Sequence, residues 1–408
     1  MRPSFLPAAT SANARRLLAA RGLRAVADGF ISLILPAYLL ALGYGPVETG
    51  IIATATLAGS AGLTLAVGLF AHRASGRALL MATSALMILT GFGFAGLQAF
   101  WPLLLVAFVG TLNPSAGDVS AFLPLEQAQL SQEAAGGERT RLFALYSFVG
   151  SSAGALGALG AGLPDLVGRA AGIAPVAALQ GAFLLYAAVG ALVLVLYAGL
   201  PRATAGAAEG PASALGPSRR IVLMLAALFS LDSFAGGFVV QSLLALWLYE
   251  RFDLSLAAAG AVFFWTGLLS SLSYFAAVRI ADRIGLVNTM VFTHLPANLC
   301  LLMVPFAPTL PVALGLLFVR SALSQMDVPT RTAYVMSVVT PAERAAAASV
   351  TAVPRSLAAA AGPTLAGLLL GATSFGWPLV IGGALKIVYD GLLLAMFRNV
   401  RPRDETDG

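Results

Sequence analysis

The chain has 408 residues, of which 59% are apolar and only 10% are charged. A water-soluble domain carries about a quarter charged residues, so this chain lacks the polar side chains to cover a soluble surface. Its net charge of +6 comes from cations scattered between apolar runs, which argues against nucleic acid as a partner. The single cysteine, Cys300, excludes a disulfide within the chain. A lipid bilayer is the remaining solvent.

Twelve apolar runs approach the roughly 20 residues that one membrane crossing needs. We expect helices at 24–43, 50–71, 78–97, 102–123, 142–162, 177–199, 221–247, 257–280, 286–307, 310–328, 346–371 and 378–397. Residues 200–220 are rich in Pro, Gly, Ala and Ser, which predicts a flexible linker. The expected fold is an all-α membrane protein with twelve transmembrane helices in two six-helix halves. Its parts are an N-terminal tail (1–20), a first half (21–199), the linker (200–220), a second half (221–397) and a C-terminal tail (398–408).

Basic residues predict the orientation of these helices. Most arginines outside the expected spans lie in alternate loops, and the intervening loops hold Arg169 and Arg251 alone. Because cytoplasmic loops carry the excess of Lys and Arg, we expect both termini in the cytoplasm and a multi-pass location in the cell's inner membrane. Arg15 and Arg16 interrupt the first 20 residues before any apolar core, so these residues do not read as a signal peptide.

The two halves resemble each other in sequence. Leucine and alanine matches mean little in so apolar a chain, but acids are rare here and their registration carries more weight. The matched acids are Asp28 with Asp232, Asp118 with Asp327, and Glu138 with Glu343. Two parallel-related halves are a known transporter architecture, with the substrate site near the middle of the membrane.

One pair of predicted loops carries a motif. The loop before 286 reads Val278-Arg-Ile-Ala-Asp282-Arg283-Ile-Gly285, which resembles the G-x-L-a-D-R-x-G-R-[RK] signature of the major facilitator superfamily. The matching loop of the first half runs from Gly68 to Arg77 and has His72 where the signature has its acid. The motif residues are Gly68, His72, Arg73, Asp282, Arg283 and Gly285. The resemblance implies the superfamily fold, and it implies that the loop acid and arginines help to lock the inward-closed arrangement.

Ionisable side chains within the spans need a partner or a function, because each costs about 2.5–3.5 kcal/mol at the bilayer centre. Residues four apart share one face of a helix, and so do residues two turns apart. This spacing predicts pairing of Arg24 with Asp28, Lys386 with Asp390, and Arg320 with Asp327.

Asp118 has no cation at such a spacing. An unpaired acid in a low dielectric holds its proton more tightly and can cycle it, so we favour Asp118 as a proton carrier. The alternatives are that it pairs with Arg355 or lies in contact with water. The complete set of proton-coupling candidates is Asp28, Asp118, Asp232 and Asp327.

Two expected helices carry helix-breaking residues close to their acids. Pro114 and Gly117 come just before Asp118, and Pro329 follows Asp327. Interrupted helices mark transporter binding sites, although a simple proline kink is the alternative. The candidates for substrate contacts are Tyr38, Asn113, Gln241, Gln325, Arg320 and Arg355.

Other chemistry has little support in the sequence. The two histidines, His72 and His294, have no further histidine or cysteine near them, so we expect no metal site. His294 could titrate, but a satisfied core histidine is the simpler interpretation. The only lysine is Lys386 and no phosphate-binding loop is present. We therefore expect no enzyme activity, no cofactor and no ATP-driven transport.

The sequence thus favours a secondary active transporter that works by alternating access and is coupled to protons. We favour efflux of a small organic compound, since a largely apolar path suits an amphiphilic substrate. One alternative is proton-coupled uptake of an anionic metabolite or a metal chelate, held by Arg320 and Arg355. Another is a receptor with a transporter-like fold that moves nothing. The expected partners are the lipid bilayer, a small-molecule substrate and protons, and the chain is expected to be a monomer.

Overall fold

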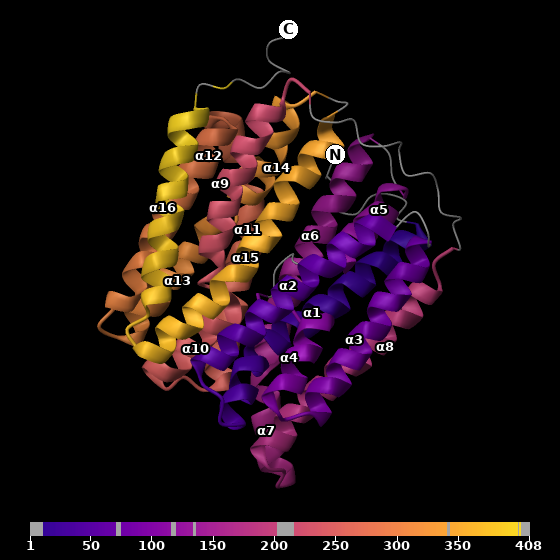
Figure 1. Cartoon of the computed structure of the whole chain (residues 1–408), viewed down its shortest axis with the longest axis vertical. Coiled ribbons are helices and arrows are strands. Elements are labelled where there is room, and N and C mark those ends of the chain that lie inside the picture. Colours follow the sequence, from indigo (N-terminus) through magenta and orange to yellow (C-terminus); the bar gives the residue numbers. More distant parts are fainter. Residues whose placement is uncertain are drawn as a thin grey trace, which may run out of the picture. The chain divides into compact units, whose positions relative to one another are not determined.

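The computed structural model describes residues 11–70, 75–115, 120–133, 136–201, 216–340, 343–398 and 400 (Figure 1). Regular structure within these ranges is helical throughout. The chain divides into two compact units. The first unit comprises Met1–Ala208 and Leu254–Phe264, and the second comprises Glu209–Asp253 and Trp265–Gly408.

Each unit contains a comparable series of helices. The first contains α1 (Ala12–Ala41), α2 (Pro46–Phe70), α3 (Gly76–Gly96), α4 (Phe100–Val109), α5 (Phe122–Ser131), α6 (Gly136–Leu159), α7 (Leu163–Ala171) and α8 (Pro175–Ala198). The second contains α9 (Arg219–Gly237), α10 (Gln241–Phe252), α12 (Leu286–Met303), α13 (Leu310–Ser324), α14 (Asp327–Val338), α15 (Arg344–Ala372) and α16 (Trp377–Phe397). Helix α11 (Leu256–Ile284) contributes its first residues to the first unit and the remainder to the second.

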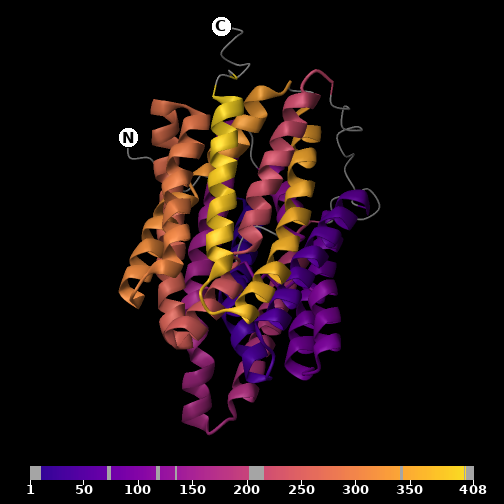
Figure 2. The same cartoon turned by 60° about the vertical axis from the view of Figure 1, so that its left-hand side comes forward.

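The same helix pairs pack together in both units. In the first unit α1 packs against α6 and α8, and α3 packs against α8. In the second unit α9 packs against α15 and α16, and α12 packs against α16. Figure 2 shows α16, in yellow, next to these neighbours. Equivalent helices thus pack together in the two units, in agreement with the sequence repeat.

Glycines allow the closest of these contacts. A methyl group added at Gly157 on α6 would lie 2.0 Å from the carbonyl oxygen of Val26 on α1. One added at Gly237 on α9 would lie 2.5 Å from the carbonyl oxygen of Ala359 on α15. Small residues are what lets the backbones of membrane helices approach each other in this way.

Three expected helices are interrupted, so their predicted single runs at 102–123, 221–247 and 310–328 are wrong. The run at 221–247 is divided into α9, which ends at Gly237, and α10, which begins at Gln241. Helix α4 ends at Val109 and α5 begins at Phe122. In the break, the Thr111 N–H donates to the Thr90 hydroxyl (3.2 Å) and the Tyr186 hydroxyl donates to the Thr111 carbonyl (3.0 Å). Side chains of α3 and α8 thus satisfy backbone groups that lipid could not.

In the second unit α13 ends at Ser324 and α14 begins at Asp327. Ten spans in the described part of the chain are long and apolar enough to cross a membrane. This number does not include the interrupted pairs α4–α5 and α13–α14. The total of twelve crossings stays a prediction.

Candidate functional site

A buried ion pair joins α1 to α5 in the first unit. The Arg24 guanidinium donates to the Glu126 carboxylate, and the two side chains are 1% and 0% exposed. The hydroxyls of Tyr146 and Tyr197 each donate to the same carboxylate at 2.5 Å. The Phe122 ring centroid lies 4.1 Å from the Arg24 Cζ atom. Glu126 therefore has a cation and two hydroxyl donors, and its cation is covered by an aromatic face.

This ion pair differs from the expected one between Arg24 and Asp28. Asp28 is buried and interacts electrostatically with Arg24 and Arg21, but Glu126 makes the direct contact with Arg24. The sequence reasoning missed Glu126 because it lies past the expected helix end at 123. An acid within the apolar sequence around Phe122 was the available signal. Asp118 lies outside the described residues.

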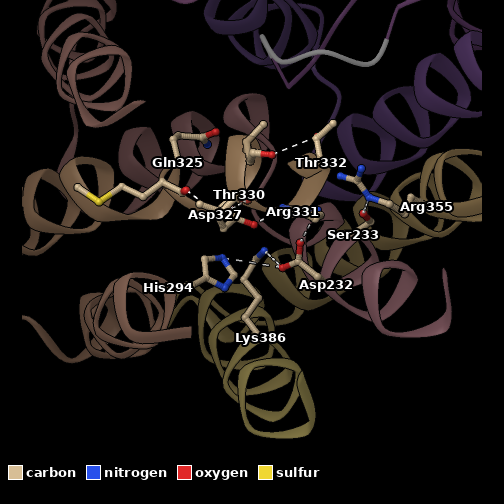
Figure 3. A network of polar contacts seen from close by, with 12 residues as sticks. Asp232, Ser233, His294, Gln325, Asp327, Thr330, Arg331, Thr332, Arg355 and Lys386 are labelled. Atoms are coloured by element: carbon tan, nitrogen blue, oxygen red, sulfur yellow. Dashed lines mark hydrogen bonds and ion pairs between the residues drawn. The ribbon is translucent and has the colours of Figure 1, made fainter. Parts of the chain in front are cut away.

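A larger network lies within the second unit (Figure 3). Asp232 on α9 accepts a hydrogen bond from Lys386 Nζ on α16 at 2.5 Å. Arg331 Nη1 on α14 lies 3.5 Å from the other carboxylate oxygen, and Arg331 also pairs with Asp327. His294 Nε2 on α12 lies 3.9 Å from Asp232 Oδ1. Three nitrogen-bearing side chains from three helices thus converge on one buried carboxylate.

A second buried carboxylate lies next to this one. Asp390 on α16 is 0% exposed, and its Oδ1 atom lies 2.8 Å from His294 Nδ1. Asn298 Nδ2, one turn along α12 from His294, donates to Asp390 Oδ2 at 2.8 Å. His294 therefore connects Asp390 with Asp232 through its two ring nitrogens.

The expected pairs of the second half are not the ones that form. Lys386 contacts Asp232 rather than Asp390, and Asp327 pairs with Arg331 rather than Arg320. Contacts between helices replace the contact along α16 that Lys386 was expected to make. Arg331 lies beyond the expected helix end at 328, whereas α14 continues to Val338.

Two arginines lie at the edge of the network. Arg355 Nε on α15 donates to the hydroxyl of Ser233 at 3.2 Å, and Arg355 interacts electrostatically with Asp232. Arg320 on α13 has a buried Nε atom for which the described residues provide no hydrogen-bond acceptor. Arg320 also interacts electrostatically with Asp232.

Of the remaining substrate-contact candidates, Gln325 is drawn with the network in Figure 3, and the others do not join it through the contacts described. The Tyr38 hydroxyl donates to the Leu97 carbonyl at 2.9 Å, at the end of α3. Asn113 Oδ1 accepts hydrogen bonds from the N–H and the hydroxyl of Ser115. Gln325 Oε1 accepts from the Tyr274 hydroxyl at 3.4 Å, and Gln241 is the first residue of α10.

The loop motif is described in its second copy and in part of its first. Asp282 and Arg283 are exposed near the end of α11, and Gly285 precedes α12 with φ of +83°. This left-handed backbone conformation favours glycine. Gly68 belongs to α2, whereas His72 and Arg73 lie outside the described residues.

Comparison with known proteins identifies the family. The family model of the Major Facilitator Superfamily matches residues 17–324 and 226–408, which together span nearly the whole chain. The chain belongs to the Major Facilitator Superfamily. It is a multi-pass membrane protein with a transporter-type fold, so the expected all-helical fold and the family resemblance are confirmed.

Relatives of this superfamily member are distant in sequence. The uncharacterized membrane protein YJR124C of Saccharomyces cerevisiae is 25% identical over 414 residues, which cover 93% of this chain and 92% of the yeast protein. The nucleoside transporter NupG is 16% identical, with a TM-score of 0.71 over 95% of this chain and 99% of NupG. The xylose transporter XylE of E. coli is 13% identical, also with a TM-score of 0.71, over 97% and 99% of the two chains. Such structural likeness establishes the fold.

Proposed function

We propose that this chain is a secondary active transporter that couples the movement of a small organic molecule to protons by alternating access. The observation that carries the proposal is the buried network around Asp232. Taking several ions out of water is costly, and a purely structural bundle gains little over apolar packing. Asp232 has three alternative nitrogen partners, Lys386, Arg331 and His294. A network whose pairs can exchange suits a protein that must pass between conformations.

The proton carriers, the oligomeric state, the location and the direction of transport that we propose are those expected from the sequence. Protons would be carried by acids among Asp28, Asp118, Asp232 and Asp327. The protein would be a monomer in a cell's inner membrane, with both termini in the cytoplasm, and the direction we favour is efflux. Tyr38, Asn113, Gln241 and Gln325 stay proposed substrate contacts.

A second candidate is proton-coupled uptake of an anionic compound. Arg355 supports it, because the contact described for its guanidinium is the neutral hydroxyl of Ser233, and the side chain is partly exposed. Arg320 adds a further cation with an unsatisfied buried nitrogen. A carboxylate or phosphate group of a substrate would match such donors.

Proteoliposomes loaded with the pH dye pyranine test the proposal. A panel of nucleosides, sugars, amino acids, lipophilic amines and organic acids is added outside, and lumenal pH and compound content are recorded together. At least one compound should cross with protons, and Asp232→Asn should abolish compound-driven proton flux. Asp165→Asn removes an exposed carboxylate paired with Arg169 and serves as the matched control. Compound flux without any proton movement would contradict the coupling.

Two further variants separate the alternatives. If the Asp118→Asn variant transports its compound at the parental rate under a pH gradient, Asp118 is not a proton carrier. Arg355→Ala should abolish flux of anionic compounds and spare neutral ones if the second candidate is right. Equal effects on both kinds of compound would favour the first.

A further inference from the structure

His294 has its two ring nitrogens facing two different carboxylates. The side chain lies on α12 and is 4% exposed. Nδ1 is 2.8 Å from Asp390 Oδ1, and Nε2 is 3.9 Å from Asp232 Oδ1. Asn298 holds the other oxygen of Asp390 at 2.8 Å. Asn298 Nδ2 also lies 3.1 Å from His294 Nδ1. The ring is therefore oriented by contacts at Nδ1, and its second nitrogen lies near a carboxylate that it does not yet bind.

The three acids of the network differ in what balances their charge. Asp232 and Asp327 each contact a permanent cation, Lys386 or Arg331. Asp390 is completely buried, and within the described part of the chain its ion-pair partner is His294. Histidine is the one cationic side chain that gains and loses its proton near neutral pH. The charge on the His294–Asp390 pair can thus change under conditions in which Lys386 and Arg331 stay charged.

We propose that His294 and Asp390 form a proton-binding site of this transporter. In the proton-free state Nδ1–H donates to the Asp390 carboxylate, and the lone pair of Nε2 faces Asp232. A proton adds to Nε2, and the resulting imidazolium competes with Lys386 for Asp232. Release of that proton restores the Lys386–Asp232 contact, so one proton enters and one leaves per cycle. The proposal rests on the proposed proton coupling and assigns it to residues outside the earlier candidates.

Every neighbouring element contributes to the charge around this ring. The titratable and charged groups on those elements are Arg219, Arg220 and Asp232 on α9, Arg320 on α13, Asp327, Arg331 and Tyr334 on α14, Lys386, Tyr389 and Asp390 on α16, and Cys300 on α12 itself. The Tyr389 ring centroid lies 5.9 Å from that of His294 and is nearly perpendicular to it. Asp390 and Asp232 are the carboxylates nearest to the ring.

Nitrogen-15 NMR of the full chain in nanodiscs tests the site without knowledge of the substrate. The chain has two histidines, so histidine-selective labelling gives two sets of ring signals. His294→Gln assigns its set by loss of signal. As the pH is lowered from about 8 to about 5, the Nε2 resonance of His294 should move from the unprotonated to the protonated position, while Nδ1 stays protonated. If the chemical shifts of both ring nitrogens of His294 stay constant across this pH range, the proposal is overturned.

Asp390→Asn identifies the partner. It removes the nearest counter-charge of the imidazolium, so the midpoint should move to lower pH by about one unit, a tenfold loss of proton affinity. Asp165→Asn should leave the midpoint unchanged. If the titration midpoint of His294 is the same in Asp390→Asn as in the parental chain, the two residues do not act as a pair.

Transport measurements distinguish a coupling role from a structural one. With a compound found in the pyranine screen, His294→Gln and Asp390→Asn should retain equal exchange of labelled for unlabelled compound and lose accumulation driven by a pH gradient. Unchanged accumulation in both variants would overturn the assignment. If the parental chain itself moves no protons with any compound, the proposed function fails, while the NMR titration still decides whether the pair binds a proton.

Discussion

The two units bury charge in different ways. In the first, Glu126 receives a guanidinium and two tyrosine hydroxyls, and within the described residues these donors make no hydrogen bond or ion pair to a second buried acid. In the second, Asp232 shares Arg331 with Asp327 and His294 with Asp390. A closed set of partners fixes one geometry, whereas shared partners allow several. Under the proposed function, the first unit's pair would hold one geometry and the second unit's network would exchange partners.

One charged position corresponds in the two units, although its sign differs. Glu126 is the fifth residue of α5, and Arg331 is the fifth residue of α14. The partner of Glu126 is Arg24 on the first helix of its unit, and a partner of Arg331 is Asp232 on α9. Arg24 lies one helical turn before Asp28, the residue that the repeat matches with Asp232. Each unit therefore has a charged pair between its first helix and the fifth residue of the later helix, with opposite signs and with the partner on the first helix shifted by one turn.

The largest effect is expected from Glu126→Gln. The change removes the counter-charge of Arg24 in a fully buried site, and breaking such a pair costs about 3–5 kcal/mol. We expect a strongly lowered melting temperature in detergent, measured by tryptophan fluorescence, or a loss of folded protein. The double variant Arg24→Met with Glu126→Leu should recover much of the loss, because no uncompensated charge remains. A tolerated Glu126→Gln would show that the first unit's pair is not a fixed support.

A smaller loss of stability is expected from Lys386→Met. Asp232 keeps Arg331 and gains the His294 imidazolium as partners, so the cost should resemble one charged hydrogen bond, about 1.5–3 kcal/mol. The same variant should move the His294 Nε2 titration to higher pH, because Asp232 no longer has Lys386 as its nearest cation. The melting temperature and the NMR midpoint measure these two effects. A loss as large as that of Glu126→Gln would erase the proposed contrast between the units.

The sequence predicts the fold far better than it predicts the site. Apolar runs of spanning length and the Asp282–Gly285 loop identify an all-helical membrane protein and its superfamily, because hydropathy and one short motif are local properties. The partners of Lys386 and Asp390 depend on which helices pack side by side, and spacing along one helix cannot supply that. Glu126 and Arg331 were missed for a related reason. Both lie in a second helix that follows an interruption, beyond the residues, 123 and 328, at which the continuous helices were expected to end.

Loop carboxylates make a final contrast between the units. Glu343, just before α15, accepts hydrogen bonds from the Gly216 N–H (2.6 Å), the Ser218 hydroxyl (2.7 Å) and the Thr340 hydroxyl (2.6 Å). It thereby attaches the start of α9 to the loop before α15. Glu133 does the same for α1 with fewer donors, accepting from the hydroxyl of Ser11 and the amide of Asn13.

The smallest effect is expected from Glu343→Gln, and it should depend on pH. Hydrogen bonds from Thr340 and Ser218 lower the pKa of Glu343 to about 2, below the value of about 4.3 in an unfolded chain. A lowered pKa stabilises the folded state above the unfolded value, and this contribution disappears as the pH falls through the folded value. The melting-temperature difference between the parent and Glu343→Gln should therefore be constant from about pH 8 to pH 5 and shrink below about pH 4.3. A difference that stays constant below that pH would show that the ionised carboxylate is not what holds α9, and the second unit would then lack the stronger of the two loop attachments.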